Sequence, residues 1–297
     1  MHTDPSYMDL LEIRKLIVVA VASDDLLVEK LVLKGGNALE LIHHIGERAS
    51  LDLDFSLRDD FQDLKEIEER LLSALHNRFV LVGLEVFDLK FERRPRRPTE
   101  AGGTWGGYNA EFKLFPHNRF PELNGLAPEK VLPTKRNLAL TSDGNQGRKF
   151  TIEISKYEFC EGAQLTQIDE YDCYVYSPAM IAAEKVRAVC QQMPGLRGKP
   201  TPRARDFYDI YAILDHDQKI DFSSESLQAL VRHMFDAKSV PLELIGGIAA
   251  FREFHRQTWP AVQNAVRGRV EPFDFYFDFV VREVRKLEPL WIVDSPA

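Results

Sequence analysis

The stretch Leu31-Val32-Leu33-Lys34-Gly35-Gly36-Asn37-Ala38-Leu39 decides how this chain folds. Its apolar start predicts a short strand over 31–33 that ends at Lys34-Gly35-Gly36. The following residues, Asn37 to His44, predict a helix with Asn37 as its N-cap. Two glycines between a strand and a helix let the backbone approach a ligand, and the helix N-terminus offers unpaired N–H groups to an anion. The motif therefore indicates a seat for phosphate, with a plain tight turn as the alternative.

A strictly alternating stretch follows at Leu51-Asp52-Leu53-Asp54-Phe55. Alternation predicts a strand with leucine and phenylalanine on one face and both aspartates on the other. Asp52 and Asp54 would then project side by side and repel each other unless a cation lies between them. Mg²⁺ prefers such oxygen ligands and commonly shares its coordination shell with substrate phosphates. The alternative is an ordinary strand with a solvated outer face.

A third carboxylate stands in Phe150-Thr151-Ile152-Glu153-Ile154-Ser155, where Glu153 interrupts a β-branched strand. A carboxylate from a neighbouring strand would complete a two-metal site for displacement at phosphorus. Glu153 as a surface strand residue is the alternative. Glu111 and Glu158 are alternatives for the same role, but neither is flanked so clearly by apolar residues.

Two helices in the second half carry charged residues on their apolar sides. Ser177-Pro178 predicts a helix start with serine as the N-cap, and Lys185 falls inside the apolar arc of that helix at about 100° per residue. On the next helix Asp206 falls on the apolar side, and Asp209 falls just outside it. A buried lysine needs a partner or a ligand. The pattern fits either a structural ion pair or a lysine that holds triphosphate oxygens, oriented by the aspartate.

Length and composition limit the classes of protein that remain. The 297 residues predict about two domains, and 44% hydrophobic with 28% charged residues exclude a disordered or fibrous chain. The longest apolar run, 16–22, is far below the roughly 20 residues that cross a bilayer. Without a visible secretory signal, and with three sparse cysteines, we expect a cytoplasmic protein that binds no membrane.

The net charge of −8 argues against a protein that coats nucleic acid through its overall field. Local binding remains open because arginines gather at 93–97 and basic residues at 197–205. We expect strands also at 80–93, 108–115 and 149–159, and the remaining segments indicate helices at 8–29, 62–78, 178–192, 203–216, 223–237, 241–266 and 272–287. The sequence predicts an α+β (α/β) protein: a mixed sheet flanked by helices in domain 1–170, and a helical domain 171–297.

Four ordered blocks resemble the AbiEii/AbiGii abortive-infection toxin nucleotidyltransferases of the DNA polymerase β-like superfamily. The resemblance spans about residues 31–214 and is carried by Lys34-Gly35-Gly36-x-x-Leu39, Arg48-x-Ser50-x-Asp52-x-Asp54, Glu184-Lys185-x-Arg187 and Arg205-Asp206-x-x-Asp209-Ile210. It implies a nucleotidyltransferase fold, an enzyme that moves a nucleotidyl group from an NTP, and a cognate antitoxin as partner. Related toxins modify tRNA at its acceptor end, which makes tRNA the expected acceptor.

The resemblance also implies roles for individual residues. Gly35 and Gly36 would seat the triphosphate, Asp52 and Asp54 would bind Mg²⁺ in a two-metal site, and Lys185 would contact the nucleotide phosphates. Asp206 would be the acidic residue of the last motif. The same blocks add further residues expected around the nucleotide: Lys34, Asn37, Arg48, Ser50 and Asp209. Two positions depart from the superfamily: Asn37 replaces the usual serine or threonine, and the third carboxylate would be Glu153 instead of aspartate.

Two other functions stay open. The nucleotide could go to a hydroxyl of a protein or a small molecule. The chain could also be a non-catalytic NTP- or RNA-binding interaction protein that kept the fold, although the Asp52/Asp54 pair and Lys185 argue against it.

Overall fold

The computed structural model describes residues 8–46, 52–95, 104–142, 147–193 and 199–292. The chain divides into two compact units. The first unit, called the sheet unit here, comprises residues 1–37, 51–156 and 164–175. The second, the helical unit, comprises residues 38–50, 157–163 and 176–297. Among the described residues, no helix combines the length and the apolar character needed to cross a membrane.

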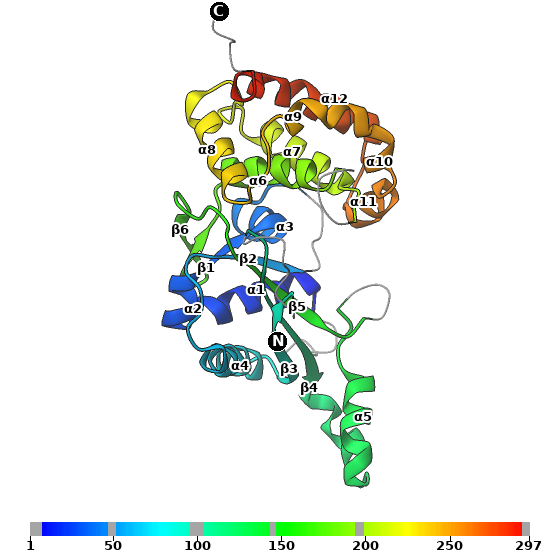
Figure 1. The fold of residues 1–297 in the computed structure, drawn as a ribbon. Helices are drawn as coiled ribbons and strands as arrows, with labels where there is room; N and C mark the ends of the chain where they lie inside the picture. The colour runs from blue at the N-terminus through cyan, green and yellow to red at the C-terminus, as the bar shows by residue number, and fades with distance from the viewer. Residues whose placement is uncertain (1–7, 47–51, 96–103, 143–146, 194–198, 293–297) are drawn as a thin grey trace, which may run out of the picture. The chain divides into compact units, whose positions relative to one another are not determined.

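The sheet unit is built on seven strands in the order β3-β4-β5-β2-β1-β7-β6 (Figure 1). Their bounds are β1 Leu31–Lys34, β2 Leu53–Leu57, β3 Leu84–Arg94, β4 Gly107–Pro116, β5 Phe150–Ser155, β6 Gln164–Ile168 and β7 Tyr171–Val175. Strand β1 is parallel to β7 and β2 is parallel to β5, whereas the other neighbours are antiparallel. The predicted mixed sheet is therefore confirmed. The strand expected at 51–55 begins two residues later, so Asp52 lies just outside β2.

One face of this sheet is the hydrophobic core of the unit. Leu33, Phe55, Ile154 and Tyr108 are partners across four adjacent strands, and all four are buried. Helices α1 (Leu10–Ala22) and α4 (Leu64–Val80) pack side by side and bury their apolar residues, with α1 beside β7. Helix α4 lies along β3 (Figure 1). Because side chains alternate along a strand, the residues between these apolar ones point to the opposite face.

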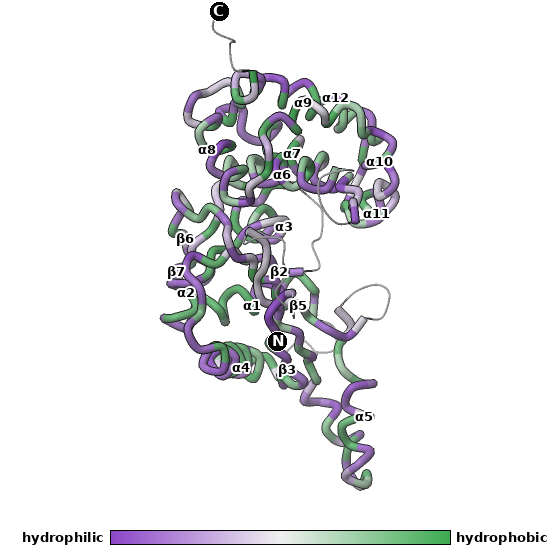
Figure 2. Tube along the Cα trace, in the orientation of Figure 1, coloured by the Kyte–Doolittle hydropathy of each residue, from purple (hydrophilic) through white to green (hydrophobic). Residues whose placement is uncertain are grey.

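The single helix predicted over 8–29 is two helices, α1 and α2 (Asp25–Lys30). The break has a local cause: the Asp24 carboxylate accepts hydrogen bonds from the backbone N–H groups of Leu26 and Leu27, which starts a new helix. Helix α5 (Pro128–Leu138) and the 3₁₀ helix η3 (His117–Leu123) were not predicted. Along α5, hydrophobic and hydrophilic residues follow one another (Figure 2) and none is buried, which explains the weak signal.

The segment after β1 corrects the expected N-cap. Helix α3 (Gly35–Ala38) begins directly at the first glycine, so Asn37 lies inside the helix and does not cap it. Gly35 has a φ of +67°, a left-handed conformation that glycine adopts without a steric penalty. The chain can therefore turn from strand to helix within one residue. The next five residues, Leu39–His43, form a π-helix, η2.

The helical unit contains α6 to α12. Their bounds are α6 Pro178–Gln191, α7 Ala204–His216, α8 Glu225–Asp236, α9 Leu244–Gly247, α10 Arg252–Arg256, α11 Trp259–Ala265 and α12 Phe273–Val284, with 3₁₀ helices at Ile248–Phe251 (η4) and Arg285–Leu290 (η5). Ser177 caps α6 as predicted, since its hydroxyl accepts from the backbone N–H of Met180 at 3.3 Å. The helix predicted over 241–266 is broken into short pieces, in a stretch that contains Gly246-Gly247 and Pro260.

Candidate active site

A row of polar side chains crosses the face of the sheet opposite to the hydrophobic core of the unit. Lys34 on β1 is the cross-strand partner of Asp54 on β2, which is the partner of Glu153 on β5. Glu153 is in turn the partner of Asn109 on β4. Cross-strand partners project from the same face, and neighbouring strands lie about 4.8 Å apart. The fold thus brings together two carboxylates, Asp54 and Glu153, that are 99 positions apart in the sequence.

The diglycine turn lies against this row. A Cβ atom added to Gly35 would lie 2.7 Å from Oδ2 of Asp54, which is closer than real Cβ contacts allow. The backbone therefore passes the Asp54 carboxylate at a distance that only glycine permits. A backbone turn this close to a carboxylate is suited to hold a phosphate whose charge a shared Mg²⁺ neutralises, because Mg²⁺ bridges carboxylate and phosphate oxygens. A backbone turn and a carboxylate are groups of the kinds that bind phosphate and Mg²⁺, respectively.

Asp52 lies next to the turn through a different contact. Its backbone carbonyl accepts a hydrogen bond of 2.6 Å from Nδ2 of Asn37, and its side chain is exposed. Across the described ranges, no three His, Cys, Asp or Glu side chains are grouped closely enough to hold a metal ion. The set of Asp52, Asp54 and Glu153 as joint ligands therefore stays a prediction.

The two competing glutamates each form ion pairs with basic side chains. Lys149 lies 2.8 Å from the Glu111 carboxylate, and this contact holds the pKa of Glu111 below its usual range. Glu158 is buried between Arg187 at 3.4 Å and Lys238 at 3.2 Å. Glu153 is exposed on the row beside Asp54. Glu153 therefore stays the predicted third carboxylate.

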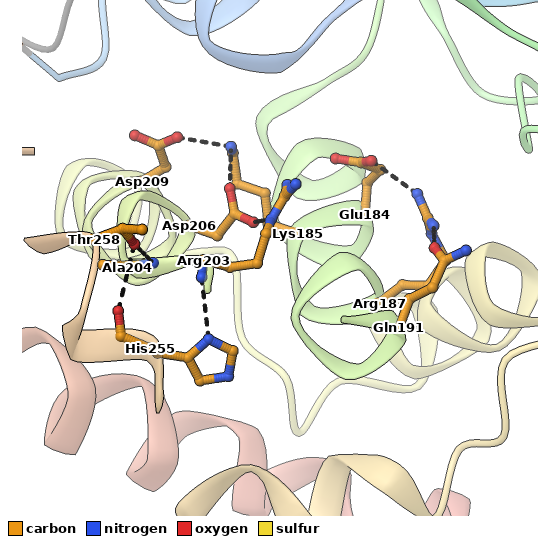
Figure 3. A network of polar contacts seen from close by, with 10 residues as sticks. All are labelled: Glu184, Lys185, Arg187, Gln191, Arg203, Ala204, Asp206, Asp209, His255 and Thr258. Atoms are coloured by element: carbon orange, nitrogen blue, oxygen red, sulfur yellow. Dashed lines mark hydrogen bonds and ion pairs between the residues drawn. The ribbon is translucent and has the colours of Figure 1, made fainter. Parts of the chain in front are cut away.

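A buried ionic network in the helical unit contains the other predicted residues (Figure 3). Nζ of Lys185 lies 2.7 Å from Asp209 Oδ2 and 3.2 Å from Asp206 Oδ1, and Arg203 pairs with the second oxygen of Asp206. Lys185 and Asp206 are buried, as their helical angles predicted. Asp209 was expected just outside the apolar stripe, but it is buried too, because Lys185 on α6 pairs with both carboxylates.

Charge compensation explains how Asp206 stays ionised at a fully buried position. Burial opposes its charge, but Arg203 and Lys185 together hold the pKa of Asp206 below its usual range. The network extends to His255, whose Nδ1 accepts from the backbone N–H of Arg203 at 3.1 Å. Thr258 accepts from the backbone N–H of Ala204 at 3.2 Å, so the start of α7 is fastened to the α10–α11 region. His255 was not among the predicted residues, because no spacing pattern in the sequence around it marks it.

The burial of His255 predicts an acid-sensitive helical unit. Burial lowers the pKa of His255 from 6.5 to about 4. Between these values the unfolded chain binds a proton that the folded chain does not, so the free energy of unfolding falls as the pH is lowered, by at most about 3 kcal/mol. Denaturant titrations at pH 7, 5.5 and 4.5 should show this fall. His255→Asn, which keeps an acceptor near the Nδ1 position, should flatten it, whereas substitution of the exposed His76 by asparagine should not.

The remaining predicted residues are placed as follows. Lys34 is buried at the end of β1, beside Asp54 in the row. Arg48 and Ser50 lie outside the described residues. Asn109 is a buried polar residue of the row that sequence analysis did not single out, because a lone asparagine in a strand carries no spacing signal.

A mixed sheet with paired carboxylates beside a diglycine turn, accompanied by a helical unit, defines the nucleotidyltransferase class of protein. A sequence model of one family, described as "Nucleotidyl transferase AbiEii toxin, Type IV TA system", matches residues 17–279. The chain belongs to this AbiEii family of toxins from type IV toxin–antitoxin systems. The family implies a nucleoside triphosphate as donor and an antitoxin as partner.

Comparison with solved structures finds similar folds at low sequence identity. JHP933 from Helicobacter pylori is 13% identical with a TM-score of 0.49, covering 94% of this chain and 90% of its own. A putative nucleotidyltransferase from H. pylori is 14% identical with a TM-score of 0.49, covering 95% and 96%. An antigenic nucleotidyltransferase-like protein from Paracoccidioides brasiliensis is 16% identical with a TM-score of 0.35, covering 81% and 92%. No curated protein matches the sequence.

Proposed function

We propose that this toxin uses Mg²⁺ to transfer a nucleotidyl group from an NTP to the 3′ end of tRNA. The observation that carries the proposal is the row in which Asp54 and Glu153 are neighbours, with the Gly35 backbone against the Asp54 carboxylate. The turn that would seat phosphate and two carboxylates from different strands meet there. Transfer of a phosphoryl-type group needs positioning and charge neutralisation more than covalent help from the protein.

The three carboxylates and the diglycine turn would have different tasks. Asp52, Asp54 and Glu153 would hold Mg²⁺, which when bound neutralises the charge that develops on the donor phosphates. The Gly35-Gly36 backbone would seat the triphosphate. Glu153 would orient the acceptor hydroxyl and take its proton as the oxygen bonds to the α-phosphorus and pyrophosphate leaves. No covalent enzyme intermediate is needed.

Lys185 would contribute from the helical unit. Two buried carboxylates, Asp206 and Asp209, pair with its ammonium group and fix its position. A fixed cation of this kind suits contact with the phosphates of the nucleotide. We therefore assign Asp206 and Asp209 to the orientation of Lys185, and assign the phosphate contact to Lys185 itself.

Exposed basic residues are the candidates for contact with the tRNA backbone. Arg93 and Arg94 at the end of β3 are exposed, and so are Lys199 and Arg205 near the start of α7. Arg203, counted with the second basic stretch in the sequence, is instead paired with buried Asp206. The rest of the two stretches, Arg96, Arg97 and Arg197, lies outside the described residues.

The proposal is tested by incubating the protein with each α-³²P-labelled NTP, total RNA and total protein from the same cells, with and without EDTA. We expect label in the tRNA fraction and no label when EDTA removes the metal. An NTP that cannot be cleaved between its α- and β-phosphates should give no label either. Label in protein or in small molecules would support the other acceptors instead. If wild type transfers no label to any fraction, the non-catalytic alternative is correct.

A further inference from the structure

A buried chain of hydrogen bonds links helix α1 to Asp52 through Asn37. Nη1 of Arg14 donates to Oδ1 of Asn37 at 3.0 Å, and Nδ2 of Asn37 donates to the backbone carbonyl of Asp52 at 2.6 Å. Arg14 is itself anchored, because its Nε donates to the carbonyl of Leu10 at 3.1 Å. Both polar ends of the Asn37 side chain are therefore used within the sheet unit.

Because these groups are buried, they cannot exchange their hydrogen-bond partners for water. Asn37 is completely buried and Arg14 is 4% exposed. A buried polar group that loses its partner costs about 1–3 kcal/mol, so each bond constrains the position of the next group. The amide of Asn37 cannot rotate toward a phosphate without leaving the Arg14 guanidinium and the Asp52 carbonyl behind. The structure therefore gives the Asn37 amide an internal role, and its expected contact with the nucleotide stays a prediction.

The position of Asp52 depends on this support. The pairing of β2 starts at Asp54 with β1 and at Leu53 with β5, so Asp52 lies outside the sheet ladder on both sides. Asn37, in contrast, belongs to α3 and lies two residues after Gly35. One side chain thus links the turn that would seat the triphosphate to the backbone that carries the first metal carboxylate.

We propose that Asn37 and Arg14 are positioning residues that hold Asp52 for divalent metal binding at the diglycine turn. This inference rests on the proposed function, because it takes Asp52 as a metal ligand. It accounts for asparagine at a position where the superfamily usually has serine or threonine. The amide accepts from the buried Arg14 and donates to the Asp52 carbonyl through two different atoms, whereas a hydroxyl group offers a single oxygen for both bonds.

The decisive variant is Asn37→Asp, which has the same shape and keeps an acceptor for Arg14 but replaces the donor to the Asp52 carbonyl. Mn²⁺ binding is followed by electron paramagnetic resonance on the full chain with an α,β-methylene NTP analogue. We expect Mn²⁺ to bind about 10-fold more weakly to the variant, a difference of about 1.4 kcal/mol. Transfer should recover at high Mn²⁺, since the ligands remain. The exposed Asn124→Asp adds the same charge elsewhere and should bind like wild type.

Separate outcomes distinguish the positioning role from the proposed function. If Asn37→Asp binds Mn²⁺ as tightly as wild type while Asp54→Asn does not, the positioning role is wrong and the metal site stands. If wild type and Asp54→Asn bind equally, the proposed function itself fails. Should Asn37→Asp not fold, Arg14→Lys, which keeps the buried charge but changes the bond to Asn37, must weaken Mn²⁺ binding for the inference to hold.

Discussion

Replacement of Asp54 by asparagine is expected to reduce nucleotidyl transfer by about 10³-fold or more, with the fold intact. The substitution removes one charge from the centre of the row, where the carboxylate faces the diglycine turn and neighbours Glu153. A neutral amide cannot hold a divalent cation beside a triphosphate as a carboxylate does. Initial rates with labelled NTP, together with a thermal unfolding curve, measure both effects.

The matched control is Asp172→Asn. Asp172 is an exposed strand aspartate in the same sheet, on β7, and it lies outside the row. Its substitution removes the same charge, so its transfer rate should stay within about 2-fold of wild type. Equal rates for Asp54→Asn and wild type would show that the row is not the active site.

The second large effect is expected from Gly35→Ala, with a loss of transfer of about 100-fold. Two causes combine. Alanine at a φ of +67° costs about 1–2 kcal/mol. Its Cβ would also lie 2.7 Å from Oδ2 of Asp54, so the carboxylate must move away from the turn. Displacement of the Asp54 carboxylate, and not the backbone strain, should cause most of the loss of activity.

Gly125→Ala separates these two causes. Gly125 has a φ of +75°, and a Cβ placed on it would meet nothing within 4 Å. Both variants should therefore lose a similar amount of stability from the backbone, whereas only Gly35→Ala should lose transfer. If both retain activity, or if both lose it in proportion to stability, the close approach of the turn to Asp54 has no catalytic meaning.

Local patterns predicted the parts of the candidate site that depend on near neighbours in the sequence. Strict alternation around Asp54 predicted a strand, and the diglycine after an apolar run predicted the turn. Helical angles predicted that Lys185 and Asp206 are buried. Such patterns work because side-chain direction repeats every 2 residues in a strand and every 3.6 in a helix. Boundaries were less accurate: the strand of Asp54 starts at Leu53, and Asn37 lies inside a helix that begins at Gly35.

Contacts between distant segments could not be predicted from these patterns. Asp54 and Glu153 are neighbours because β2 pairs in parallel with β5. The local sequence pattern of a strand does not indicate which other strand it pairs with. The burial of Asp209 follows from Lys185 on another helix. The hydrogen bond from Arg203 to His255 and the bond from Asn37 to the Asp52 carbonyl also join residues on different elements, which no helical or strand periodicity relates.

By itself the sequence determined which residue types carry the chemistry and on which kind of element each one stands, because backbone geometry and side-chain periodicity are local properties. Four ordered blocks were enough to indicate the family. Only the tertiary structure decided which carboxylates are neighbours, which cations occupy the competing glutamates, and what holds Asp52 beside the turn. Those outcomes depend on strand order and on the pairing of buried charges, and both are settled by packing across the whole chain.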